Sequence, residues 1–145
     1  MTPDMMIAAV LILPLLIAAG IAATGWLPNL REGVTFVGAG LLFAIVIMLS
    51  LQVAAGGRPE LYIGEAAPGL EFAFKLEPLG ALFALVASGL WIVNSLYSVG
   101  YMRGNRERNQ TRFYICFAFA ILGAMGVAMS ANLFTLFIFY EVLTL

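Results

Sequence analysis

Apolar residues run along this chain in long blocks, which short polar stretches separate. The first block, residues 5–24, has about 20 residues, enough for an α-helix to cross the hydrocarbon core of a bilayer. Three similar blocks follow at residues 34–53, 79–102 and 113–130, and a shorter one covers residues 132–145. The pattern predicts an all-α fold, a polytopic transmembrane helix bundle with four full spans and the start of a fifth.

Two details of the N-terminal region refine this prediction. The first block follows Asp4 and no Lys or Arg, so we expect a retained span and not a signal peptide. Pro14 lies inside this block and is expected to kink the helix, or to be tolerated through contacts with neighbouring helices. Residues 28–33, which include Arg31 and Glu32, are expected to form a short turn before the second span.

A different pattern fills residues 54–77, which are rich in Gly, Pro and acidic side chains. Residues 70–76 alternate apolar and other side chains with the period of two that is typical of a β-strand. Residues 60–63 precede a turn region at Gly64, so we expect a small extramembrane hairpin between the second and third spans. The Glu-Pro pair at residues 77–78 then predicts a helix start, with an acid at the positive end of the helix dipole.

Composition supports a membrane protein and excludes several classes of function. Hydrophobic residues make up 63% of the chain and charged residues 10%, with a mean hydropathy of +1.02. Soluble domains are about half apolar and about a quarter charged. The net charge of −1 leaves no basic face for a nucleic acid. The chain has no His and a single cysteine, Cys116, which we expect to be a small buried hydrophobe.

The same inventory argues against catalysis by this chain alone. It holds no recognisable metal-ligand cluster, phosphate-binding glycine loop or nucleophile–base pair. We therefore expect no metal, no cofactor and no enzyme active site here, and we look for function in charged groups inside the apolar blocks.

Positive charge concentrates between the third and fourth spans. The charged residues there are Arg103, Arg106, Glu107, Arg108 and Arg112. Short loops rich in Lys and Arg stay on the cytoplasmic side, so residues 103–112 are predicted to be cytoplasmic. Alternation then places the N-terminus and residues 54–77 outside, in a multi-pass protein of the cell's inner (plasma) membrane.

Glu141 is the candidate functional residue. It lies nine residues beyond Asn132, about 14 Å along an α-helix, and therefore near the middle of a hydrocarbon core about 30 Å thick. A charge there costs at least about 2.5–3.5 kcal/mol. This cost implies a neutral carboxyl, a partner cation or a water-lined cavity, and each of these suits a proton-binding acid in the fifth span.

A plainer interpretation of Glu141 stands beside this one. If Leu145 were the true end of the protein, Glu141 would lie close enough to a terminus to reach water as a tolerated surface acid. Thr144 shares a helix face with Glu141 and is a candidate donor to its carboxyl. Phe137, one turn earlier, is expected to pack, and Tyr140 points in another direction.

Four segments in the second half of the chain resemble one known family. They are residues 74–83 (Phe-Lys-Leu-Glu-Pro-Leu-Gly-Ala-Leu-Phe), 96–102 (Leu-Tyr-Ser-Val-Gly-Tyr-Met), 112–114 (Arg-Phe-Tyr) and 132–141, which ends in Phe-Tyr-Glu. From about Phe72 to its end the chain resembles the antiporter-like proton-translocating membrane subunits. These include the large membrane-arm subunits of complex I, the A and D subunits of Mrp-type Na⁺/H⁺ antiporters, and relatives in membrane-bound hydrogenases.

Within that family the chain looks most similar to the D type of Mrp antiporter subunits. Two departures leave the subfamily open. Tyr140 stands where complex I subunits often have Trp, and the Glu-Pro-Leu-Gly run at residues 77–80 stands where many relatives have an Asp and a Ser.

The resemblance implies a mechanism. Residues 1–145 would be one membrane domain, the N-terminal part of a longer subunit, because Leu145 lies within a helix. In such subunits the fifth-helix Glu, matched here by Glu141, pairs with a Lys on a later broken helix that this chain does not contain. The implied function is a subunit of a multisubunit Na⁺/H⁺ antiporter, with protons, Na⁺, the lipid bilayer and other membrane subunits as partners.

Two alternatives stay open at this point. The first is a redox-driven proton-pumping subunit of a complex I-like NADH:quinone oxidoreductase or of a membrane-bound hydrogenase. The second belongs to another class, a non-conducting scaffold fragment that only assembles with other membrane subunits.

Overall fold

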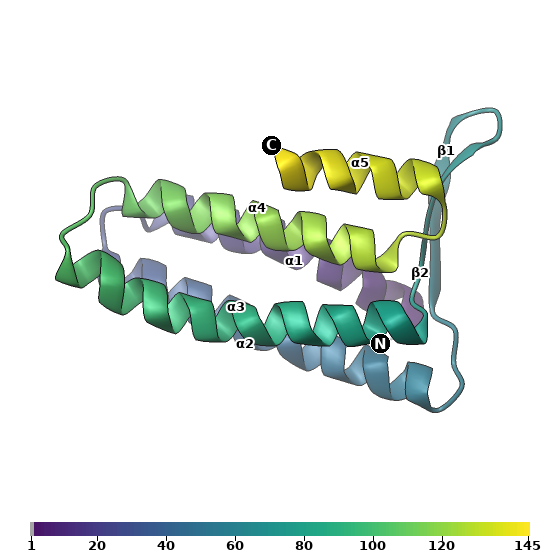
Figure 1. Ribbon diagram of the computed structural model, residues 1–145, viewed down its shortest axis with the longest axis horizontal. Helices are drawn as coiled ribbons and strands as arrows, with labels where there is room; N and C mark the ends of the chain where they lie inside the picture. Colours follow the sequence, from purple (N-terminus) through teal and green to yellow (C-terminus); the bar gives the residue numbers. More distant parts are fainter. Residues whose placement is uncertain (1) are drawn as a thin grey trace.

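The structure, a computed structural model, describes residues 2–145 as a bundle of antiparallel helices with a β-hairpin across one end (Figure 1). The elements in chain order are α1 (Pro3–Ala23), α2 (Pro28–Ala54), β1 (Glu60–Ala67), β2 (Leu70–Lys75), α3 (Pro78–Gly104), α4 (Gln110–Met129) and α5 (Leu133–Thr144). Helices α1 to α4 are long and apolar enough to cross a membrane, and α5 is a shorter apolar helix. The predicted fold class, a helical membrane bundle with a small hairpin between its second and third spans, is confirmed.

Proline marks the first turn of three helices. Pro3, Pro28 and Pro78 begin α1, α2 and α3, where the missing N–H is not needed and the ring fixes a helical φ. Pro14 lies in the middle of α1, and the helix continues through it. The prolines in the first turns therefore define where these helices begin more precisely than the apolar blocks do.

The predicted turn over residues 28–33 is wrong. Because α2 begins at Pro28, Arg31 and Glu32 lie in its first two turns, and both are buried. Charged side chains are almost never buried without a partner, so a polar stretch next to an apolar block resembles a surface turn in the sequence. The structure buries these two residues because α3 and α4 supply their partners.

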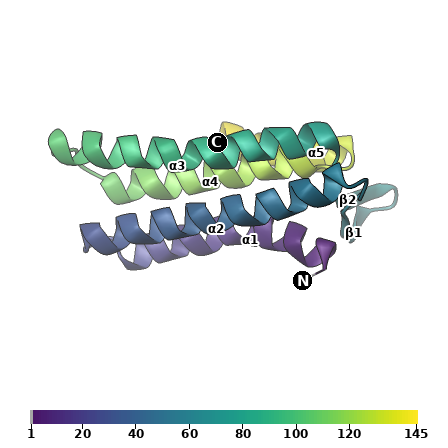
Figure 2. The ribbon, with the colours of Figure 1, turned by 90° about the horizontal axis from the view of Figure 1, so that it is seen from below.

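The helices lie side by side, with α1 against α2 and α4, α2 against α3, and α5 against α4 (Figures 1 and 2). Large apolar side chains fill the interior of the four-helix bundle that α1, α2, α3 and α4 form. They include Leu42, Leu49, Trp91, Met125 and Met129. A Cβ at Gly38 would overlap the side chain of Ile17. The small residue therefore permits the close contact of α1 with α2, as in other membrane helix pairs.

Polar groups on α3 also face the interior. Ser95 and Ser98 are buried, and the buried Ser88 hydroxyl donates to the carbonyl oxygen of Ala84, 2.7 Å away, in its own helix. Cys116 behaves differently from the prediction, since it is exposed on α4 and not packed inside. A membrane helix is apolar on every side, so its sequence gives little sign of which face points inward.

The hairpin lies across the end of the bundle where α2 ends and α3 begins (Figure 1). β1 and β2 pair antiparallel. β1 continues through Gly64 to Ala67, so the turn predicted at Gly64 lies instead at Pro68 and Gly69. Proline followed by a glycine with φ of 84° fits a type II turn.

Candidate functional site

The start of α5 is fixed to strand β2 by hydrogen bonds. Asn132 caps the helix, and its side-chain oxygen accepts from the Thr135 amide at 2.9 Å. The Asn132 side-chain nitrogen donates to the Glu71 carbonyl oxygen at 2.8 Å. Thr135, fully buried, donates its hydroxyl to the same oxygen at 3.3 Å and accepts from the Ala73 amide at 3.3 Å. The amide of Ala131 completes the contact by donating to the Ala73 carbonyl oxygen at 3.0 Å.

Aromatic contacts extend this junction along α5. The rings of Phe72 and Phe134 meet edge to face at a centroid distance of 5.4 Å, and those of Phe74 and Phe139 at 5.5 Å. Such pairs add about 0.5–1.5 kcal/mol beyond the burial of their area. On the other side of Phe139, a Cβ at Gly126 of α4 would overlap the ring. The absence of a side chain at Gly126 thus lets α5 lie close against α4.

This junction decides where Glu141 is placed. Glu141 follows Asn132 by nine residues, about 14 Å along the helix from the point where β2 holds it. The side chain of Glu141 is exposed on this chain, as are Phe137 and Tyr140, at 60% and 55%. Phe137 is therefore not packed as expected. Thr144 donates to the backbone carbonyl oxygen of Glu141 at 3.0 Å, and not to its carboxylate.

The ion pairs formed among residues 2–145 do not include Glu141. Over the same residues, no three His, Cys, Asp or Glu side chains come together as a group that could hold a metal. The structure thus presents the acid on a helix face of this chain, and its role as a proton-binding residue stays a prediction.

A second charged group, which the sequence did not reveal, lies at the opposite end of the bundle. Arg103, at the end of α3, forms a bidentate ion pair with Glu32 of α2. Its Nε donates to Oε1 of Glu32 at 3.0 Å, and its Nη2 donates to Oε2 at 2.5 Å. The same guanidinium also donates to the side-chain oxygen of Asn29 at 2.6 Å. A guanidinium that donates to both oxygens of a carboxylate makes one of the stronger and more directional ion pairs in proteins.

Arg31 joins this group from the inside of the bundle. It is 4% exposed, and its guanidinium donates to Thr111 at 3.2 Å and to the side chain of Gln110 at 2.9 Å. It also lies 5.2 Å from the ring centroid of Tyr114 and 3.6 Å from the Glu32 carboxylate. The buried pair therefore connects the start of α2 to α3 and α4.

The sequence held one usable sign of this group. Pro28 in the first-turn position starts α2 early enough to bring Arg31 and Glu32 into the helix, next to the apolar interior. Nothing local pointed to Arg103, which lies 71 residues beyond Glu32.

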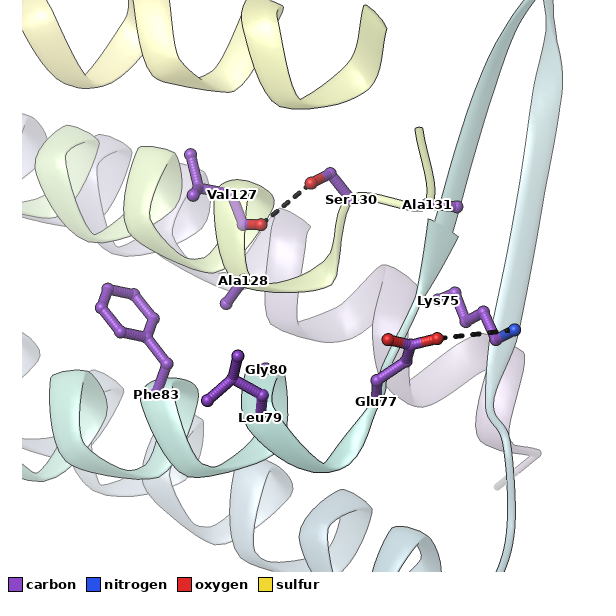
Figure 3. Close-up of a pocket in the computed structure, with 9 residues that line it drawn as sticks. All are labelled: Lys75, Glu77, Leu79, Gly80, Phe83, Val127, Ala128, Ser130 and Ala131. Carbon is purple, nitrogen blue, oxygen red and sulfur yellow. Dashed lines mark hydrogen bonds and ion pairs between the residues drawn. The ribbon is translucent and has the colours of Figure 1, made fainter. Parts of the chain in front are cut away.

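A pocket of about 470 Å³ opens at the hairpin end, between the start of α3 and the end of α4 (Figure 3). Its lining is mostly apolar and includes Leu79, Phe83 and Val127. At its mouth Lys75 lies 3.7 Å from Glu77, and it lies equally close to Glu60 on the paired strand. Exposed pairs of this kind contribute little stability.

The hairpin beyond this pocket carries mainly negative charge. Desolvation, and then the nearby carboxylates of Glu65 and Glu71, raise the pKa of the Tyr62 phenol. Any proton or cation that reaches the bundle from this end meets a surface rich in acids.

These features define a multi-pass helical membrane protein with one acid inside an apolar fifth helix. Residues 66–114 match the family model described as NADH-Ubiquinone oxidoreductase (complex I), chain 5 N-terminus. The Na(+)/H(+) antiporter subunit A1 of Staphylococcus aureus (strain bovine RF122 / ET3-1) is 39% identical over 74 residues, 50% of this chain and 9% of the relative. Subunit A1 of the JH9 and Newman strains is 38% identical over the same shares.

The matches confirm the resemblance of this chain to the N-terminal portion of the antiporter-like, complex I-like membrane subunits. The aligned part covers only 9% of the length of these relatives. The relatives are of the A type, so they do not support the closer resemblance to the D type of Mrp subunits. Glu141 lies beyond the residues that the family model matches.

Proposed function

We propose that this chain is part of an ion-translocating subunit of a multisubunit Na⁺/H⁺ antiporter, in which Glu141 takes up and releases a proton. The similarity to an antiporter subunit of the A type supports the class of function. The observation that carries the role of Glu141 is its position, about 14 Å along a helix whose start β2 fixes by side-chain and backbone hydrogen bonds. Because the matched relatives are antiporter subunits of the A type, we propose the A type, and not the D type, as the kind of subunit to which this chain is related.

The chemistry follows from the cost of a charge at this depth. An acid in the hydrocarbon region stays ionised only beside a cation or water, and it binds a proton when that partner moves away. A Lys on another helix, as the family resemblance implies, would form a pair with Glu141 whose two titrations are coupled. Opening the pair would raise the proton affinity of Glu141, and closing it would release the proton.

The two ends of the bundle support an orientation. The hairpin and the start of α1 lie at one end, and the turn between α3 and α4, which carries most of the arginines, lies at the other (Figure 1). We place the arginine-rich turn in the cytoplasm and the hairpin outside, in the plasma membrane. Other membrane subunits of the complex would cover the exposed face of α5.

A second candidate function has its own support. The family model that matches residues 66–114 describes a complex I subunit, which favours a redox-driven proton pump. The chain itself would then hold no redox cofactor, and the driving reaction would take place in another subunit. A non-conducting scaffold is the outcome if neither activity depends on Glu141.

The test uses the full-length protein in its complex, in inverted membrane vesicles. Addition of Na⁺ should dissipate a preformed pH gradient in the wild type, and Glu141→Gln should abolish the response because an amide cannot carry the proton. Glu65→Gln, an exposed change of the same kind in the hairpin, is the matched control and should respond as the wild type does. Native gel electrophoresis checks that all three complexes assemble.

The outcomes separate the candidates. An equal response of Glu141→Gln and wild type makes Glu141 a structural acid and contradicts the proposal. If Na⁺ has no effect on any of the three, proton pumping driven by an electron donor is compared in the same vesicles. Loss of that pumping in Glu141→Gln alone supports the redox-driven function. Equal pumping in all three complexes, or pumping in none of them, supports the scaffold.

A further inference from the structure

A polar pocket lies at the arginine-rich end of the bundle, between the start of α2 and the turn that joins α3 to α4. Its volume is about 520 Å³, and its lining residues are Pro28, Asn29, Arg103, Arg106, Glu107 and Gln110. Arg103 is already engaged by Glu32 and Asn29. Arg106 is exposed and takes part in no ion pair within residues 2–145. The pocket therefore offers a positive side chain that has no carboxylate partner in this part of the protein.

An apolar groove of about 450 Å³ begins at the same place and runs along α1 and α2. Its lining residues are Leu13, Leu16, Ile17, Asn29, Leu30, Gly33, Val34, Val37, Gly38 and Leu41. Asn29 lines both the groove and the polar pocket, so the two adjoin at this residue. Gly33 leaves the groove open near its polar end, because a Cβ there would meet no atom within 4 Å.

The size of the groove fits one leaflet of a bilayer. From Asn29 to Leu41 is twelve residues of α2, about 18 Å along the helix axis, compared with about 15 Å for half of the hydrocarbon core. Trp26, in the turn before α2, is 80% exposed at the same end, where a tryptophan is favoured at the membrane–water interface. A lipid with its acyl chain in the groove would thus have its headgroup at the level of the polar pocket.

Charge indicates which lipid fits. The charged residues at this end of the bundle are Arg31, Glu32, Arg103, Arg106, Glu107, Arg108 and Arg112. Five arginines against two glutamates give this end a positive potential, and basic pockets beside membrane helices favour anionic headgroups. A zwitterionic headgroup would gain much less electrostatic binding energy, because its own positive group would face the arginines.

We propose that this site binds one anionic phospholipid, with its phosphate beside Arg106 in the polar pocket and an acyl chain in the groove between α1 and α2. Asn29 lies at the junction, within reach of the glycerol and ester region. The inference concerns the opposite end of the bundle from the β2–α5 junction, and it does not depend on the role of Glu141.

The experiment measures lipid binding to the delipidated full-length protein with its partner subunits, in detergent. The probes are phosphatidylglycerol, phosphatidylcholine with the same acyl chains, and inorganic phosphate, and the readouts are native mass spectrometry and the shift of the thermal unfolding midpoint. We expect phosphatidylglycerol to bind more tightly than phosphatidylcholine. Inorganic phosphate should give no comparable stabilisation, because it cannot fill the groove.

Two pairs of variants test the two halves of the site. Arg106→Gln should weaken phosphatidylglycerol binding about fivefold, the factor that corresponds to about 1 kcal/mol per arginine near a charged surface. Arg112→Gln removes the same charge from the same end, outside the pocket, and should have a smaller effect. Gly33→Leu should weaken binding by filling the groove, whereas Gly40→Leu on the same helix, outside the groove and also in open space, should not.

Several results would overturn the proposal. Equal losses in Arg106→Gln and Arg112→Gln would reduce the effect to general surface charge. Stabilisation by inorganic phosphate as strong as that by phosphatidylglycerol would make the pocket a free-anion site, and equal binding of the two lipids would remove headgroup selectivity. Unchanged lipid binding in Gly33→Leu would exclude the groove.

Discussion

The two ends of this bundle are closed by different kinds of interaction. At the hairpin end, the start of α5 is held to β2 by uncharged hydrogen bonds from Asn132 and Thr135, and aromatic pairs reinforce them. At the arginine-rich end, the starts and ends of helices are held together by the buried carboxylate of Glu32 between Arg31 and Arg103. The same antiparallel helices thus meet a neutral junction at one end and a charged one at the other.

The difference matters for how each end responds to its surroundings. A buried ion pair is costly when one partner is removed, because the other charge is left unpaired away from water. Removing one partner of a neutral hydrogen bond costs less free energy of unfolding, and salt does not screen such a bond. The neutral hydrogen bonds between β2 and α5, which fix the start of the helix that carries Glu141, should therefore depend little on ionic strength, whereas the arginine-rich end depends on its charges.

The largest expected effect is that of Glu32→Gln, which leaves Arg31 and Arg103 without their carboxylate. We expect it to lower the free energy of unfolding of the full-length protein by about 3 kcal/mol, measured by thermal or denaturant unfolding in detergent. Glu107→Gln makes the same change at an exposed position of the same end and should cost little. Similar losses in the two variants would mean that the buried pair does not hold this end together.

The next effect should come from the contact of α5 with α4. Gly126→Val places a side chain where the ring of Phe139 lies, and overpacking of this kind costs about 1–3 kcal/mol. Hydrogen exchange should become faster in α5 while the rest of the bundle stays protected. Gly100→Val introduces the same side chain into open space on α3 and controls for the change of residue type. Unchanged exchange in α5 would show that this contact does not determine its position.

The smallest effect should be that of Thr135→Val, which removes the hydroxyl between α5 and β2 but keeps the shape of the side chain. We expect the free energy of unfolding to fall by about 1 kcal/mol. Hydrogen exchange of the Ala73 amide should become faster, because this amide loses its acceptor. Thr144→Val removes a hydroxyl that bonds only within α5 and serves as the control.

Ionic strength then sharpens the comparison between the two junctions. Added salt should leave the loss caused by Thr135→Val unchanged, whereas it should reduce the loss caused by Glu32→Gln, because half-exposed Arg103 is open to screening. The same salt dependence for both losses would contradict a neutral and a charged junction.

The elements of the fold were predictable because their signals are local. Each span is one apolar block, the hairpin is one alternating stretch beside glycines and prolines, and the first residues of α3 follow from Glu77 and Pro78. Errors arose where polar residues had two interpretations. Residues 28–33 were expected to form a turn, and the hairpin turn was expected at Gly64, because glycine and charged residues are common in turns and also occur inside strands and helices.

By itself, the sequence determined that the chain forms membrane-spanning helices, that positive charge gathers at one end, and that one acid lies about 14 Å into the fifth helix. Only the tertiary structure decided that Glu32 is buried between Arg31 and Arg103, that Thr135 is bound to β2, and that Cys116 and Glu141 face outward. The reason is physical. The pattern of apolar residues that defines a helix or strand involves only residues that are close together in the sequence. The rotation of a helix about its axis, and hence the partner of each polar side chain, depends on packing against residues far away in the chain.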